Sequence, residues 1–237
     1  MSYPPELLAL GILILFGIIV FLMIRTSRRE QNEQDHQLRQ LGFEPLEDAP
    51  LELESRVEEL YQTRRGREIK LWRVFKRRES DQDLYLFDAE DTRGESSELG
   101  SEIFGLISNQ LALPHFSLVT LPEFDRGSLF GGLIDKILDR VMSYAEGHLG
   151  LQRIEFPNQP ELDDQLILFG QDPDAVREML DSVGLNTFRS TQLPVQIAGK
   201  GDFLTVDFST PSDLNQPGKD LVSRYQTFSQ ITRAFME

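Results

Sequence analysis

An uninterrupted run of eighteen apolar residues, LLALGILILFGIIVFLMI, occupies positions 7–24. At about 1.5 Å of rise per residue the run spans roughly 27 Å as a helix, close to the thickness of the hydrocarbon core of a bilayer. A helix also satisfies every backbone amide of a single segment in lipid. The run therefore predicts one N-terminal transmembrane helix that contacts the lipid bilayer through residues 7–24.

The charges that flank this run predict its orientation. Arg25, Arg28 and Arg29 follow it directly, whereas Glu6 is the one charged side chain before it. Because basic residues favour the cytoplasmic side, we expect a single-pass protein of the inner (cytoplasmic) membrane with its C-terminal domain in the cytoplasm, and the three arginines at the membrane interface. A cleavable signal peptide, the alternative, has the opposite order, with a basic residue before the apolar stretch and small residues after it.

The composition of the remaining chain is typical of a folded domain. The 237 residues are 40% hydrophobic and include sixteen Phe, enough for a substantial core. The absence of cysteine agrees with a cytoplasmic location. The net charge is −15, and its distribution is uneven: residues 1–78 hold 13 basic and 12 acidic side chains, whereas residues 79–237 hold 11 and 27. This acidity argues against nucleic-acid binding, since the neutralisation of phosphates needs a basic surface.

The hydrophobic pattern divides the chain into three parts. Residues 1–29 form the anchor with its basic flank, residues 30–47 form a juxtamembrane stalk, and residues 48–237 form a cytoplasmic α+β domain. The polar stalk is rich in helix formers, so the anchor helix is expected to continue into water as far as Gly42.

Two hydrophobic periods alternate along the domain and predict its elements. A period of 3.6 residues indicates helices over residues 48–66, 128–147, 172–184 and 220–236. Short segments rich in β-branched and aromatic residues indicate strands over residues 68–75, 83–90, 102–109, 115–121, 165–170, 192–198 and 203–208. The expected fold class is α+β, with a largely antiparallel sheet, packed helices and a single N-terminal transmembrane helix before them.

A basic segment lies in the first third of the chain. It consists of Arg64, Arg65, Arg67, Lys70, Arg73, Lys76, Arg77 and Arg78. These side chains either face anionic lipid headgroups or belong to a solvated strand and its flanks, and the sequence favours the second interpretation slightly.

The histidines do not form a recognisable metal site. His36, His115 and His148 share no ligand spacing such as HxH or HExxH, and the chain has no cysteine. The segment GSLFGGLID lacks both the Lys-Ser/Thr of a P-loop and the GxGxxG of a dinucleotide fold. No cofactor and no catalytic, cofactor-binding or metal-binding residue is therefore predicted.

Two groups of carboxylates are the remaining candidates for acid–base or divalent-cation chemistry. Asp163 and Asp164 are adjacent, and adjacent residues on a strand point to opposite faces. The run of Asp88, Glu90 and Asp91 fits a solvated strand end and turn. The structural interpretation is favoured for both groups.

Three segments of the chain carry recognisable motifs: QLGFEPL near Leu41, LALPHFSLVTLPEFD from position 111, and LILFGQDPDAVREML from position 166. They resemble a family of uncharacterised bacterial membrane-anchored proteins, in which an LGF segment precedes a sheet, an LPxFxLxPE motif lies mid-chain, and a strand ending in glycine leads into a helix containing VR. The candidate motif here comprises Pro114, Phe116, Leu118, Pro122 and Glu123, with one extra residue before the Pro-Glu pair. The resemblance implies no catalytic residue, because the family has no activity to carry over.

The motif also has a structural interpretation. Pro114 and Pro122 bracket a short segment in which Phe116 and Leu118 alternate with smaller residues, as in an edge or terminal strand. Glu123 is then a hydrogen-bond acceptor at the corner.

The favoured function is a membrane-tethered cytoplasmic binding or scaffolding module that recruits a protein partner at the membrane, with an acidic surface suited to a basic partner. The alternative is a membrane-associated hydrolase or transferase whose site is assembled from scattered carboxylates and histidines. A third hypothesis is an envelope-stress or lipid-sensing role through the basic segment near Trp72.

Overall fold

The computed structural model of the chain describes residues 16, 25, 31–61, 69–91, 98–120, 150–156, 166–184, 188, 195–208 and 221–236. The chain forms two compact units, residues 1–42 and residues 43–237. The predicted anchor lies outside the described residues except for Phe16, which is helical. No helix within the described residues has the length and apolar character needed to cross a bilayer. The anchor and its orientation therefore stay predictions.

In the first unit, residues 31–40 are helical, as the sequence predicts for the stalk. The helix ends at Leu41 and Gly42, whose amides donate to the carbonyls of Gln37 and Arg39. Gly42 has a φ of 83°, a left-handed conformation that glycine adopts without steric cost.

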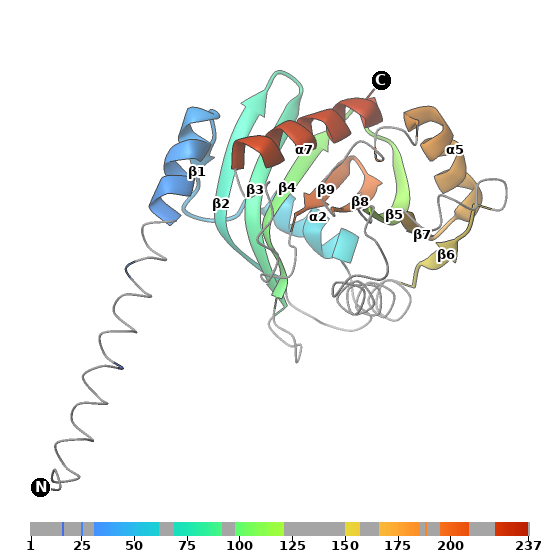
Figure 1. The fold of residues 1–237 in the computed structure, drawn as a ribbon, viewed down its shortest axis with the longest axis horizontal. Coiled ribbons are helices and arrows are strands. Elements are labelled where there is room, and N and C mark those ends of the chain that lie inside the picture. Colours follow the sequence, from blue (N-terminus) through green and yellow to red (C-terminus); the bar gives the residue numbers. More distant parts are fainter. Residues whose placement is uncertain are drawn as a thin grey trace, which may run out of the picture. The chain divides into compact units, whose positions relative to one another are not determined.

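The second unit is built on one antiparallel sheet, and within the described residues the sheet has nine strands (Figure 1). The strands are β1 (Glu44–Pro45), β2 (Ile69–Glu79), β3 (Gln82–Asp91), β4 (Glu98–Ser108), β5 (Leu113–Thr120), β6 (Gln152–Ile154), β7 (Leu166–Gly170), β8 (Gln196–Gly201) and β9 (Phe203–Asp207). Their order across the sheet is β1-β2-β3-β4-β9-β8-β5-β7-β6, and every neighbouring pair is antiparallel. The α+β class and the antiparallel sheet are thus confirmed.

Three helices accompany the sheet in the described part of this unit: α2 (Leu51–Tyr61), α5 (Pro173–Val183) and α7 (Leu221–Met236). All three match helices predicted from the 3.6-residue period. The helix predicted over residues 128–147 lies outside the described residues. Strands β1 and β6 were not predicted, because two or three residues carry no measurable period, and β1 falls within the segment expected to be a stalk.

The two faces of the sheet are covered by different helices (Figure 1). Leu53 and Val57 of α2 pack in one cluster with Tyr85, Ile103 and other residues of β2–β4, β8 and β9. On the opposite face, the ring of Phe228 in α7 stacks on Phe104 of β4 at 5.1 Å between centroids. Ile103 and Phe104 are neighbours on one strand and so point to opposite faces. The alternation of buried residues in β4 thus places α2 and α7 on the two sides.

Strand β5 differs from its prediction. Pro114 suggested an edge or terminal strand, but β5 lies between β8 and β7. The interior position is possible because the β5–β8 register shifts between Leu113 and Phe116, and β7 pairs with β5 only from Phe116 onward. Pro114 therefore stands where the ladder is already interrupted, so its missing N–H removes no ladder hydrogen bond.

Helix α5 begins and ends as the sequence predicts. Asp172 is the N-cap, and its carboxylate accepts hydrogen bonds from the amides of Asp174 and Ala175 at 3.1 and 3.2 Å. Pro173 occupies the first turn, and Gly184 caps the C-terminus with a φ of 79°. The apolar side of the helix buries Val176 and Leu180.

Candidate functional site

The most unusual polar site in the described residues is a carboxylate buried inside the sheet. Asp88 of β3 is 4% exposed. Both neighbouring strands are irregular beside it: the β2–β3 register shifts between Trp72 and Phe75, and the β3–β4 register shifts next to Asp88. The residues that carry these bulges, Arg73 and Glu102, have φ angles of 52° and 58°. Non-glycine residues seldom adopt this left-handed conformation, which costs about 1–2 kcal/mol per residue.

The bulges bring charged groups from four elements together. The amide of Glu102 donates to Oδ1 of Asp88 at 2.6 Å. A guanidinium nitrogen of Arg73 lies 3.9 Å from Oδ2 of Asp88 and 4.0 Å from Oε1 of Glu102. Arg224 of α7 pairs with Oε2 of the same glutamate. We call these four residues the Asp88 network.

Electrostatics in the Asp88 network favour a structural role. Burial raises the pKa of Asp88, while the amide of Glu102 and the charge of Arg73 offset part of that increase. Every charged group in the network faces a group of opposite charge. A carboxylate this buried does not reach a substrate in solution, so the network holds α7 and three strands together instead of presenting an acid or base.

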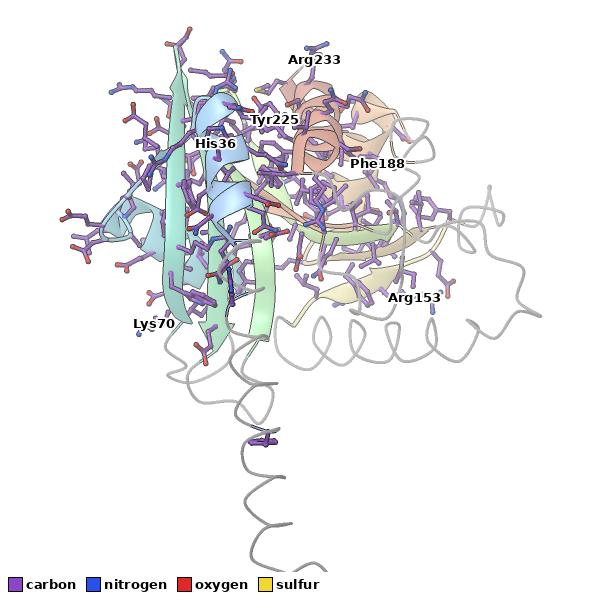
Figure 2. All side chains as sticks on the ribbon, turned by 60° about the vertical axis from the view of Figure 1, so that its left-hand side comes forward. His36, Lys70, Arg153, Phe188, Tyr225 and Arg233 are labelled. Atoms are coloured by element: carbon purple, nitrogen blue, oxygen red, sulfur yellow. The ribbon has the colours of Figure 1, made fainter. Side chains whose placement is uncertain are left out.

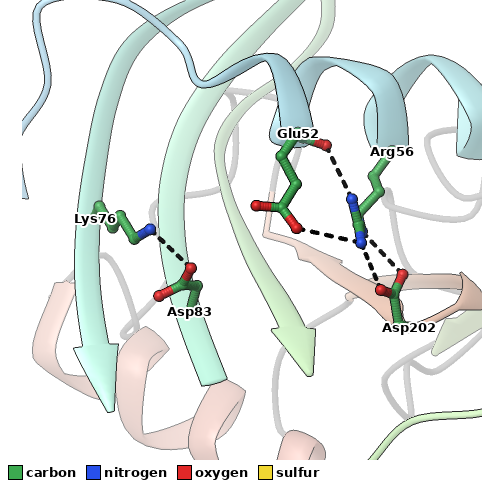
Figure 3. Close-up of polar contacts among 5 residues, drawn as sticks. All are labelled: Glu52, Arg56, Lys76, Asp83 and Asp202. Carbon is green, nitrogen blue, oxygen red and sulfur yellow. Dashed lines mark hydrogen bonds and ion pairs between the residues drawn. The ribbon is translucent and has the colours of Figure 1, made fainter. Parts of the chain in front are cut away.

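A second set of ion pairs lies at the α2 side of the sheet (Figure 3). Arg56 of α2 donates Nε and Nη2 to the two carboxylate oxygens of Asp202 at 2.9 and 2.5 Å. Glu52, one helical turn earlier, lies 3.3 Å from the same guanidinium. Arg56 lowers the pKa of Asp202 through this fork-shaped contact. The pair fastens α2 to the β8–β9 turn.

Strand β1, helix α2 and the loop between them carry many exposed carboxylates. We call this surface the acidic ridge and define it by its exposed carboxylates: Glu44, Glu47, Asp48, Glu52, Glu58 and Glu59. Arg56 is the one basic residue between positions 44 and 59, and it is bound to Asp202. Leu51 lies on the same helical face and is 83% exposed.

The basic segment is largely neutralised where the structure describes it. Arg73 belongs to the Asp88 network. Lys76 lies 2.7 Å from Asp83 (Figure 3), and Arg77 lies 2.5 Å from Glu79. Lys70 and Arg78 are exposed. The other three arginines of the segment lie outside the described residues. The structure thus favours a strand with its own ion pairs over a continuous basic surface.

The candidate motif does not form a polar site in the described residues. Phe116 and Leu118 have no exposed surface and belong to the core, and Pro114 is half-buried. Phe116 stacks on Phe235 of α7 at 5.7 Å between centroids. Pro122 and Glu123 lie outside the described residues. What the structure describes of the motif is therefore a packing element.

Of the arginines predicted at the membrane interface, Arg25 is helical and exposed, whereas Arg28 and Arg29 lie outside the described residues.

The side chain of His115 contacts the end of α2. Its Nε2 donates to the carbonyl of Leu60 at 3.2 Å, and burial lowers its pKa. This histidine is a neutral link between β5 and the end of α2.

No metal site emerges in the described ranges, where no three His, Asp or Glu side chains cluster closely enough to hold an ion. Asp163 and Asp164 fall outside those ranges. The run of Asp88, Glu90 and Asp91 was expected to be a solvated strand end, and for Asp88 this was wrong. Its position between Phe87 and Ala89, on a strand with apolar residues on both faces, was the signal that it is buried.

A scan against protein-family models finds no match for the sequence, and a search among curated proteins finds none either. Among solved structures, a similar backbone occurs in the crystal structure of the mycobacterial trehalose monomycolate transport factor A, TtfA. The likeness covers 84% of this chain and 87% of that chain, with 9% sequence identity and a TM-score of 0.46. Values this low assign neither a function nor a ligand to the present chain.

Proposed function

We propose that the protein is a membrane-tethered binding or scaffolding module, and that it holds a protein partner at the cytoplasmic side of the membrane through the acidic ridge. The tether is the apolar run at residues 7–24, and its orientation follows from Arg25, Arg28 and Arg29. The partner surface is basic and carries an apolar side chain that packs on Leu51.

The observation that carries this proposal is the excess of negative charge on the ridge. Six carboxylates and Leu51 are exposed between positions 44 and 59, and the one cation of that segment, Arg56, is shared between Glu52 and Asp202. Like charges on one surface repel each other and are relieved when a surface of opposite charge covers them. An exposed apolar side chain among such charges provides buried contact area once a partner excludes water.

Other polar groups of the described region support a binding role over a catalytic one. Asp88, the most buried carboxylate, is held by Arg73 and the Glu102 amide. Tyr61 is buried and its hydroxyl lies 3.0 Å from that of Thr205. His115 donates to a backbone carbonyl. These groups stabilise the fold through their partners, whereas the carboxylates of the ridge are exposed to another molecule.

A charge-reversal experiment tests the proposal. The full chain is extracted from its cells in a mild detergent and the size of its complex is measured by chromatography with light scattering. Glu58→Lys with Glu59→Lys should release the partner. High salt should do the same, because it screens the attraction between exposed charges. Glu178→Lys with Asp181→Lys on the exposed side of α5 changes the charge equally and should leave the complex intact. Equal behaviour of the two double variants would contradict the proposal.

A further inference from the structure

Trp72 is an exposed aromatic residue near the edge of the sheet. Its exposure is 47%, although it lies in the middle of a long strand. Strand β1 pairs with β2 only at Phe75 and Lys76. No strand in the described part of the chain pairs with the outer side of residues 69–73. Leu71 packs beneath α2, so Trp72, the next residue, points to the opposite face and away from the acidic ridge.

An exposed cation lies beside Trp72. Lys70 is two residues earlier on the same strand, and therefore on the same face. Figure 2 shows Lys70 at one end of β2, with its side chain projecting away from the sheet. Glu90 is the cross-strand partner of Lys70, and Asp88 is that of Trp72. Asp88 is buried and held by Arg73, so it offers no exposed negative charge near the indole.

The length of the chain limits the distance between this edge and the predicted anchor. Nineteen residues separate Ile24 from Glu44, the first residue of β1, which pairs with β2. Ten of them, residues 31–40, are helical. The segment therefore spans at most about 46 Å when the other nine residues are extended. A chain that crosses the bilayer through residues 7–24 can therefore bring the edge of β2 to the lipid headgroups.

We infer that Trp72 and Lys70 form a contact site for anionic lipid headgroups, distinct from the acidic ridge. Tryptophan prefers the interfacial layer of a membrane, since its ring is apolar and its N–H remains hydrogen-bonded. The Lys70 ammonium is placed to meet a lipid phosphate beside it. This inference rests on the membrane attachment in the proposed function, but not on the protein partner.

The sequence supplies its own probe, because Trp72 is the one tryptophan of the chain. The full chain is reconstituted into vesicles of neutral phosphatidylcholine, or of phosphatidylcholine with phosphatidylglycerol, and flotation confirms its attachment. We expect Trp72 emission in the anionic vesicles to shift to shorter wavelength, to be quenched by brominated acyl chains, and to resist iodide. Added salt should reverse the shift. Lys70→Gln should reduce it, whereas Arg78→Gln, at the other exposed cation of β2, should not.

The failures of the two proposals are distinguishable. A chain that does not float with the vesicles overturns the membrane attachment and this inference together. A chain that floats but shows the same emission and iodide quenching in both kinds of vesicle overturns the lipid contact alone. Equal loss of the shift in Lys70→Gln and Arg78→Gln would also overturn the assignment, because it would make the effect one of total charge.

Discussion

At the scale of single residues, the Asp88 network shows how a sheet accommodates a buried charge. Arg73 and Glu102 each occupy a bulge in a left-handed conformation, and the two bulges face the same aspartate from opposite sides. An extra residue in each neighbouring strand turns polar groups toward β3 that a regular ladder would direct elsewhere. The backbone strain of two residues is thereby offset by contacts among four charged groups.

The strain at Arg73 can be separated from its charge. Arg73→Ala and Arg73→Gly both remove the guanidinium, but only glycine adopts the φ of 52° without steric cost. We expect the glycine variant to be more stable than the alanine variant by about 1 kcal/mol in urea unfolding of the detergent-solubilised chain. Lys70, exposed in the same strand, is the matched control. There the order should reverse, because glycine weakens an ordinary strand. The same order at both positions would contradict a strained bulge.

The buried charge of Asp88 predicts a pH dependence. Burial raises its pKa in the folded state above the unfolded value of about 3.9, so between these two values the folded chain binds the proton more tightly. Its contribution to stability is therefore largest at low pH and falls as the pH rises through the folded pKa. Asp88→Asn keeps the acceptor for the Glu102 amide but does not titrate.

The measurement is the free energy of unfolding of the wild type minus that of Asp88→Asn. This difference should decrease as the pH rises from about 4, and become constant once Asp88 is ionised in both states. Asp88→Ala, which leaves the Glu102 amide without its acceptor, should lose about 2–4 kcal/mol at neutral pH. If this difference in unfolding free energy stays constant or rises with pH, burial does not disfavour the ionised form of Asp88.

At the scale of elements, what could be predicted from the sequence is what local residues determine. Asp172 and Gly184 mark the ends of α5 because caps act within a few residues of a helix terminus. The short connection between the predicted strands at residues 192–198 and 203–208 is local in the same way. In the structure β8 continues to Gly201, so the turn is shorter than that connection. Helices α2 and α7 follow from their apolar period.

The order of the strands had no such local signal. β9 lies beside β4, and β5 lies between β7 and β8, across long separations in sequence. Pro114 indicated an edge strand because its missing N–H matters only where a neighbour pairs, and the bulge that removes this requirement is a property of the β5–β8 pair. The Asp88 network was missed likewise, because its members come from four elements.

The packing of α5 on the sheet depends on a close approach at Gly170. A Cβ at this position would lie 2.7 Å from Cγ2 of Val176 and 2.9 Å from Cδ1 of Ile154. Gly170→Ala should therefore cost about 1–3 kcal/mol of stability in the same unfolding assay. Val176→Ala makes room for the new methyl group, so the double variant should lose less than the two single losses added together. Strict additivity would mean that α5 moves away freely.

At the scale of the whole molecule, the chain combines a predicted anchor, a sheet stabilised by its own ion pairs, and an acidic ridge with exposed Leu51. The net charge of −15 describes the chain as a whole, and the ridge is a place where six carboxylates are exposed, with Arg56 shared between Glu52 and Asp202. We expect the predicted anchor to restrict binding to partners at the membrane. We expect the ridge to select partners with a basic surface. From these features we infer that a basic partner binds this ridge.

The most direct test places a photo-crosslinking residue at position 51 of the full chain in living cells. We expect a discrete crosslinked product that disappears when Glu58→Lys and Glu59→Lys are added. We expect no such product from the crosslinker at Glu178, which is exposed on α5. Products of the same kind from both positions would contradict the claim. So would a product from position 51 that survives reversal of the ridge charges.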